Sequence, residues 1–221
     1  MKAAEYRLTA NIDGFLPVYT FCMCPGGTIV PATSYKDTNI VNGMSNYSRD
    51  GKFANSACVA GVNLEKLLGR AISAEEALSW TEDLERSFYI DGYSAPACSI
   101  KDFMERSSSP SVPSVSDSSY PLGLKEAPLW ELLPTAVSDS LRQGLKIFIH
   151  KLKGFDAGVI LGLESKTSAP IQVLRGPGGL CNGFSNLFVS GEGSGYAGGI
   201  ISSASDGIKA AMEIIERCDN I

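Results

Sequence analysis

Short hydrophobic runs separated by turn-forming residues fill the first 64 positions of the chain. The runs are rich in β-branched and aromatic side chains, and Gly, Pro, Asn or Asp stands between neighbouring runs. This alternation is typical of short β-strands joined by tight turns. It predicts strands at 18–23, 27–33, 39–44 and 56–64.

Two later stretches change to a helical period. In 73–90 the apolar positions recur every three or four residues, Ser73 and Glu76 match a capping box, and Gly92 supplies a stop. In 134–152 an apolar face ends before Gly154, and the only histidine, His150, lies near the end of the helix. We expect His150 to have a structural role, because no Ser or Cys motif marks it as a catalytic base.

The last third alternates predicted strands and helices. Strands are predicted at 157–163, 171–175 and 186–190, and a glycine-rich turn then leads into a terminal helix. One face of this helix is apolar, and its members are Ile200, Ala204, Ile208, Ala211 and Ile215. The Ser/Pro-rich segment 107–119 is expected to be a mobile surface loop.

Composition narrows the classes of function. The net charge of the 221 residues is −5, which argues against a nucleic-acid partner. A single histidine excludes a two-histidine zinc motif, and we expect no metal site. No apolar run is long enough to span a membrane, and the start of the chain lacks a secretory signal, so we expect a cytoplasmic protein.

The strongest chemical signal lies at 187–200. There a hydrophobic run enters the turn GEGSGYAGG, which opens the terminal helix. A helix N-terminus carries unpaired N–H groups and about half a positive charge, and glycines allow a ligand close to the backbone. The pattern therefore predicts a site for an anion or an electron-rich ring.

A dinucleotide fingerprint is formally present in this turn at Gly193, Gly195 and Gly198. That fingerprint requires a following strand that ends in an acidic residue ~20 positions later. Glu213 and Glu216 stand at about that distance, but on helical positions. The segment is therefore interpreted as a closing strand–turn–helix element and not as an opening βαβ unit.

Three blocks of the sequence resemble a bacterial family of FAD-dependent dehydrogenases with a glutathione-reductase-like architecture. They are TFCMCPGGTIVPATS (20–34), VNGMSNYSRDGKFANSA (41–57), and LESKTSAPIQVLR (163–175) together with GEGSGYAGGIISSASDGI (191–208). The third block is the most specific. Together the blocks extend over nearly the whole chain.

The resemblance implies roles for individual residues. Glu192 would hydrogen-bond the ribityl or phosphate region of FAD, and Gly198, Gly199 and Ile200 would start the helix that faces the flavin ring. Lys166 takes the place of an arginine in family patterns, and Lys166, Thr167 and Ser168 would lie near the ring and the substrate. The remaining cofactor-binding residues implied by the turn are Gly191, Gly193, Gly195, Tyr196 and Ala197.

The opening GxGxxG element of such flavoproteins is absent from these 221 residues. We therefore expect a missing N-terminal FAD-binding segment, or a second chain that supplies it. The expected fold class is α+β or α/β, with a β-rich substrate domain at 1–165 and the C-terminal part of an FAD-binding domain at 166–221.

Two further features of the sequence have more than one possible role. Cys22 and Cys24 are weak catalytic candidates. They are structural residues of the substrate domain, a redox pair that a turn would have to bring together or residues that face the substrate, or metal ligands. Arg49 is either half of an ion pair at the Arg49-Asp50-Gly51 turn or a contact for a substrate anion.

The resulting functional hypothesis is an FAD-dependent oxidoreductase that transfers hydride through the flavin to a small-molecule substrate, with NAD(P)H as a candidate electron donor. The alternatives are a nucleotide- or phosphate-binding module without redox chemistry and an inactive fragment.

Overall fold

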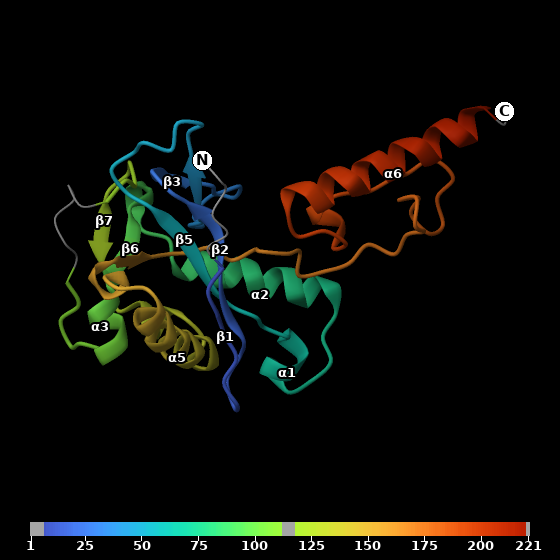
Figure 1. Ribbon diagram of the computed structural model, residues 1–221. Coiled ribbons are helices and arrows are strands. Elements are labelled where there is room, and N and C mark those ends of the chain that lie inside the picture. Colours follow the sequence, from blue (N-terminus) through green and yellow to red (C-terminus); the bar gives the residue numbers. More distant parts are fainter. Residues whose placement is uncertain (1–6, 112–117, 220–221) are drawn as a thin grey trace. The chain divides into compact units, whose positions relative to one another are not determined.

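The computed structural model describes residues 7–111 and 118–219 (Figure 1). The chain forms two compact units. The first comprises Met1–Ala71 and Glu82–Ser165, and the second comprises Ile72–Thr81 and Lys166–Ile221. The division into a substrate domain at 1–165 and part of an FAD-binding domain at 166–221 remains a prediction.

Three small sheets build the first unit. β1 (Thr9–Ala10), β2 (Val18–Cys24) and β5 (Asn55–Ala60) form an antiparallel sheet in the order β1-β2-β5. β3 (Gly27–Pro31) pairs with β4 (Val41–Ser45) in an antiparallel hairpin. In the third sheet, β6 (Ala95–Ser99) lies between β7 (Leu124–Glu126), which is parallel to it, and β8 (Val159–Leu161), which is antiparallel.

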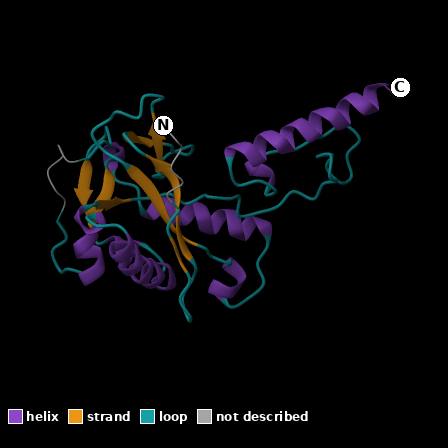
Figure 2. Cartoon of the chain, viewed as in Figure 1, coloured by secondary structure: helices purple, strands orange, loops and turns teal. Residues whose placement is uncertain are grey.

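The helices are α1 (Leu64–Leu68), α2 (Ala74–Ser87), α3 (Ile100–Glu105), α4 (Leu129–Leu132), α5 (Thr135–Lys151) and α6 (Ile200–Asp219). Single 3-10 turns occur at Asp91–Tyr93, Phe155–Ala157 and Glu192–Ser194. Figure 2 shows how these helices and the short strands are joined by extended loops. The structure is therefore a mixed α and β fold, as the sequence predicts.

Local sequence signals explain the boundaries of several elements. The predicted capping box of α2 forms: the Ser73 amide donates to Glu76 Oε2 at 2.8 Å, and the Glu76 amide donates to Ser73 Oγ at 3.2 Å. The predicted strand 56–64 ends early, at Ala60, because Asn63 accepts a hydrogen bond from the Lys66 amide and starts α1. The predicted stop at Gly92 is also displaced, since α2 ends at Ser87.

Helix α5 packs closely on the β1-β2-β5 sheet. Val137, Leu145 and Phe148 from its predicted apolar face are buried, whereas Leu152, just past its last turn, is exposed. A Cβ atom on Gly144 would lie 2.6 Å from Val18 Cγ1 of β2. The absence of a side chain at position 144 therefore allows the helix to approach the strand.

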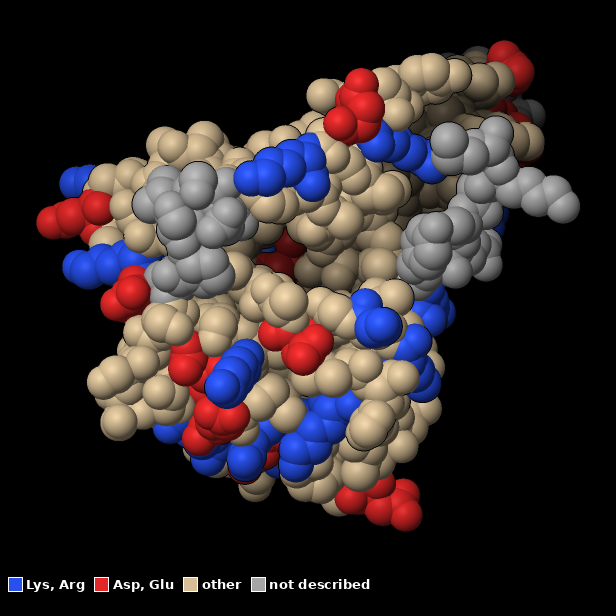
Figure 3. Space-filling view, turned by 60° about the vertical axis from the view of Figure 1, so that its left-hand side comes forward, with Lys and Arg blue, Asp and Glu red and all other residues tan. Residues whose placement is uncertain are grey.

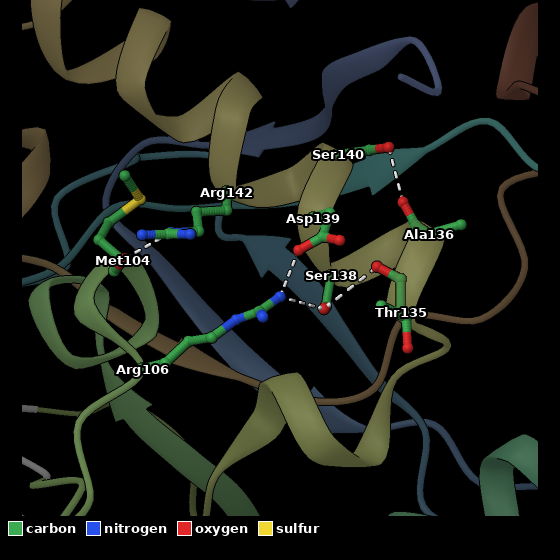
Figure 4. Close-up of polar contacts among 8 residues, drawn as sticks. All are labelled: Met104, Arg106, Thr135, Ala136, Ser138, Asp139, Ser140 and Arg142. Atoms are coloured by element: carbon green, nitrogen blue, oxygen red, sulfur yellow. Dashed lines mark hydrogen bonds and ion pairs between the residues drawn. The ribbon is translucent and has the colours of Figure 1, made fainter. Parts of the chain in front are cut away.

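Polar contacts tie α3 to α5 (Figure 4). Arg106, which ends α3 with a left-handed backbone conformation, pairs with Asp139 and donates to Ser138 Oγ at 3.2 Å. Arg142 Nε donates to the Met104 carbonyl at 2.6 Å. These arginine contacts satisfy carbonyl and carboxylate groups beside the core and fix the spacing of the two helices.

The two strands predicted in the second unit, at 171–175 and 186–190, do not form. Residues 171–175 and 186–190 make only the single bridges Arg175–Cys181 and Leu180–Phe188. The residues between them, 176–185, include four glycines and a proline, which break the ladder into short pieces. The predicted strand 157–163 does form, but it is shorter, at Val159–Leu161.

Helix α6 begins at Ile200 as predicted, but its apolar face is not buried. Ile200, Ala204, Ile208, Ala211 and Ile215 are all exposed, and Ala210 is the helix's buried residue. The shared apolar face that the sequence predicts is therefore present, and it is exposed.

The predicted mobile loop lies partly outside the described residues, because 112–117 belong to the undescribed part. At its described edge, Ser111 donates from both its amide and its hydroxyl to Asp102 Oδ2. Among the described helices, none is both long and apolar enough to cross a membrane.

Candidate functional site

The glycine-rich turn before α6 is held in one shape by its own backbone. Gly191 and Gly195 have φ values of +83° and +82°, which non-glycine residues rarely adopt. Between them, Glu192–Ser194 forms a 3-10 turn in which Ser194 is fully buried and donates to the Gly191 carbonyl at 2.6 Å. These two glycines and the serine hydroxyl define the path of the turn.

Residues 171–173 form hydrogen bonds and close contacts that support the turn. Val173 donates its amide to the Ser194 carbonyl at 3.0 Å, and Gln172 Nε2 donates to the Gly195 carbonyl at 3.2 Å. A Cβ atom on Gly195 would lie 2.3 Å from the Ile171 carbonyl oxygen. Gly195 is therefore required by packing inside the chain as well as by its backbone conformation.

A buried ion pair connects the turn to α6. Arg175 Nη2 donates to both carboxylate oxygens of Asp206, at 2.9 and 2.8 Å, and its side chain is only 2% exposed. Asp206 also accepts the Gly191 amide at 2.9 Å, and this bond, followed by the Arg175 guanidinium, lowers the pKa of Asp206. The guanidinium carbon of Arg175 lies 4.0 Å from the centre of the Tyr196 ring. The start of the turn at Gly191 and its interior at Tyr196 thus both contact one charged pair.

Three other glycines of the turn are not explained by contacts within the chain. Gly193, Gly198 and Gly199 do not have the positive φ that favours glycine. A Cβ atom would meet nothing within 4 Å at Gly193, and would make ordinary contacts at 3.4 Å at Gly198 and 3.7 Å at Gly199. A Cβ atom is therefore sterically allowed at all three positions, and at Gly193 the surrounding space is open.

The start of α6 lies directly after these three glycines. Ser202 Oγ accepts the Gly199 amide at 3.1 Å and donates to the Gly199 carbonyl at 3.0 Å. The following amides of the first turn have no acceptor within the helix, and the 20-residue helix places its positive end there. The arrangement favours an anionic or electron-rich ligand.

The other predicted residues of the second unit lie at different places around the turn. The Thr167 carbonyl oxygen lies 3.4 Å from the Cβ position of Gly198, so the structure brings Thr167 to the turn. Lys166 is half-buried, Ser168 and Glu192 are exposed, and Ala197 is buried. Tyr196 packs on Arg175 and is 47% exposed.

The predicted residues of the first unit form a separate group. Cys22 and Cys24 lie at an irregular step of β2; Cys22 has a φ of +48°, and the Cys24 thiol donates to the Cys22 carbonyl at 3.2 Å. Arg49 has a φ of +53°, and its carbonyl oxygen lies 2.3 Å from the position that a Cβ atom on Gly26 would take. The described residues contain no cluster of three or more His, Cys, Asp or Glu side chains that could hold a metal ion.

Sequence reasoning missed two residues that shape the turn. Asp206 occupies a polar position on the side of α6 opposite its apolar stripe, and this placement is the signal that could have identified it. Gln172 lies within a run that was expected to be a strand, so its side-chain contact with Gly195 was not foreseen.

Comparison with known proteins identifies the family. A model of the family described as "FAD-dependent protein, C-terminal domain-like" matches residues 1–167. The chain belongs to this family. The match covers the described part of the first unit and ends at Thr167, beside Gly198 of the turn.

A longer relative gives the context of this FAD-dependent family member. A protein of Clostridium beijerinckii, named "Uncharacterized protein", is 38% identical over 223 residues. The alignment covers 99% of this chain and 42% of the relative. The chain therefore spans less than half the length of the relative that it matches.

Proposed function

We propose that the glycine-rich turn and the start of α6 bind FAD, and that the chain is part of an FAD-dependent oxidoreductase. The observation that carries the proposal is a set of glycines at the positive end of a long helix that neither backbone conformation nor packing requires: Gly193, Gly198 and Gly199. The family supplies the identity of the cofactor.

When bound, the flavin ring accepts and donates hydride, which no side chain can do by itself. In the proposal the chain supplies binding and orientation. The first amides of α6, after Gly198 and Gly199, face negative charge on the ring, and Glu192 accepts hydrogen bonds from hydroxyl groups of the cofactor. The Thr167 carbonyl lies beside Gly198, and Lys166 directly precedes Thr167 in the chain.

The proposal includes a partner segment and a small-molecule substrate. A turn and one helix end contact only a part of a dinucleotide, and the chain spans 42% of its relative. The remaining FAD contacts are therefore assigned to additional polypeptide, on the same chain or another. The described residues and the comparisons give no support to a nicotinamide donor, and Arg49 and the Cys22–Cys24 pair stay candidates for the substrate side.

The charge distribution agrees with a small-molecule substrate. On the face drawn in Figure 3, Lys and Arg alternate with Asp and Glu, without an extended patch of one sign. The overall charge of −5 gives no attraction for a phosphate backbone.

The test compares valine at two glycines that tolerate a Cβ atom, Gly198 and Gly176, in the complete protein. Gly198→Val fills the space that the cofactor is proposed to occupy and should weaken FAD binding at least tenfold, about 1.4 kcal/mol. Glu192→Ala should weaken it less. Gly176→Val is the matched control, because Gly176 belongs to the same unit, lies outside the turn, and a Cβ there meets nothing within 4 Å.

The measurement is the visible absorption of bound flavin and its titration, with circular dichroism to establish folding. If Gly198→Val and Gly176→Val bind FAD equally well, the turn is not the FAD site. If nucleotides without a flavin ring stabilise the protein and FAD adds no colour, the non-redox binding module is the correct function.

A further inference from the structure

One face of α6 is a continuous apolar stripe open to solvent. At about 100° per residue, Ile200, Ile201, Ala204, Ile208, Ala211, Met212 and Ile215 fall within about 120° of arc. The stripe is about 22 Å long at 1.5 Å per residue. Exposure is 88% at Ile200, 61% at Ile208 and 59% at Ile215.

The opposite face of α6, which contacts its own unit, is the polar one. It holds Asp206, paired with Arg175, and Glu213, which accepts from Arg217 Nε at 2.7 Å. A Cβ on Gly178 would lie 2.6 Å from Glu213 Oε2, which places this face against the 176–180 loop. An ordinary surface helix has the reverse arrangement, with its apolar side inward.

Two further exposed apolar side chains of the second unit are leucines that lie next to the isolated β-bridges Arg175–Cys181 and Leu180–Phe188. Leu174 and Leu187 are both exposed, and they accept amides from Asn182 and Cys181, respectively. The stripe also begins at the glycine-rich turn, because Ile200 and Ile201 directly follow Gly199. A partner on the stripe would therefore reach the proposed cofactor site.

We propose that the α6 stripe is the docking surface for the polypeptide that corresponds to the unaligned part of the Clostridium beijerinckii relative. More than half of that relative lies outside the alignment, so a segment of sufficient size is available. The partner surface would be an apolar sheet or helix face flanked by polar residues that meet Glu216 at the rim of the stripe. The assignment rests on the proposed function, because the same segment would complete the FAD site.

The experiment produces this chain together with the unaligned segment of the Clostridium beijerinckii protein in one cell. Co-purification followed by light scattering should give a one-to-one complex. Ile208→Glu in the middle of the stripe should weaken the complex at least tenfold in a titration. Lys209→Glu, the next residue but outside the stripe, is the matched control and should leave the affinity within about twofold.

Circular dichroism of each variant alone shows whether α6 remains helical, and Ile215→Lys gives a second disruption at another turn of the stripe. Absence of a complex with the wild-type chain overturns the proposal, and so does a complex that tolerates both substitutions. If the wild-type chain alone is a dimer that Ile208→Glu dissociates, the occupant is a second copy and the proposal is wrong. A complex that forms through the stripe but binds no FAD contradicts the proposed function and leaves the docking surface in place.

Discussion

At the scale of single residues, glycine serves two purposes in the turn that precedes α6. Gly191 and Gly195 are needed for the turn itself, through positive φ and, at Gly195, through contact with the Ile171 carbonyl. Neither backbone conformation nor packing requires glycine at positions 193, 198 and 199. The sequence alone shows five similar glycines, because a backbone angle and the space around a Cβ position are properties of the folded chain.

Asp206→Asn should destabilise the second unit strongly. The substitution leaves the guanidinium of Arg175 buried without its charged partner and weakens the bond to the Gly191 amide. Loss of one partner of a buried pair costs about 3 kcal/mol or more. Urea unfolding followed by circular dichroism measures the effect. Glu213→Gln on the same helix is the control, because its exposed pair with Arg217 contributes about 0.5 kcal/mol or less.

Asp102 should make the stability of the first unit sensitive to acid. Hydrogen bonds from Ser99 and Ser111 lower the pKa of Asp102 from 3.8 to about 2. Because the folded pKa is below the unfolded one, the stabilisation is complete above pH 3.8 and is lost as the pH falls towards 2. Thermal unfolding across this range should show a smaller acid-induced loss in Asp102→Asn than in wild type. Parallel curves for the two proteins would contradict this role.

At the scale of elements, α5 and α6 show where hydrophobic periodicity succeeds and where it stops. Both helices are predicted from the same spacing, and both form. The face of α5 is buried on β2, whereas the face of α6 is exposed. Periodicity identifies which side of a helix is apolar, but it does not tell whether the covering surface belongs to the same chain. For the same reason, residues 171–175 and 186–190 have the composition of strands without forming them.

Gly144→Ala should loosen the contact between α5 and β2. The added methyl group would lie 2.6 Å from Val18 Cγ1, so the helix or the strand has to move. Overpacking of this kind costs about 1–3 kcal/mol, although alanine has the higher helix propensity. Chemical denaturation of the two proteins gives the difference. Val18→Ala in the Gly144→Ala background should restore part of the loss by removing the clash.

At the scale of the whole molecule, the two units differ in the core that each contains. The clusters of large buried side chains among the described residues, with Phe88, Phe103, Phe148 and Leu145, lie in the first unit. The described residues 166–219 bury chiefly small side chains, such as Cys181, Ala197 and Ala210. The second unit therefore relies on hydrogen bonds and one buried ion pair more than on apolar packing.

Hydrogen exchange of the isolated chain should reflect this difference. Amides of α5 should be protected to near the global stability, whereas amides of α6 should exchange through local opening at lower free energy. Mass spectrometry of peptides from each helix measures both. Equal protection of α5 and α6 would show that the second unit is as cooperative as the first.

Much of the fold could be predicted from the sequence, but less of the candidate site could. The strands at β2 to β4, the capping box at Ser73 and the start of α6 follow from local rules. The turn at 191–199 was recognised by its glycines, and Thr167 lies beside it. The pairing of Arg175 with Asp206 was not predicted, because it joins residues 31 positions apart through tertiary structure.

The two kinds of glycine in the turn have a consequence for mutational scanning. A library in which every turn position is varied can be sorted once for protein abundance and once for retained flavin colour. Gly191 and Gly195 should be depleted in both sorts, whereas Gly193, Gly198 and Gly199 should be depleted only in the second. Two sequencing profiles of one library would thus separate the residues that the turn needs to fold from those that it needs to bind flavin.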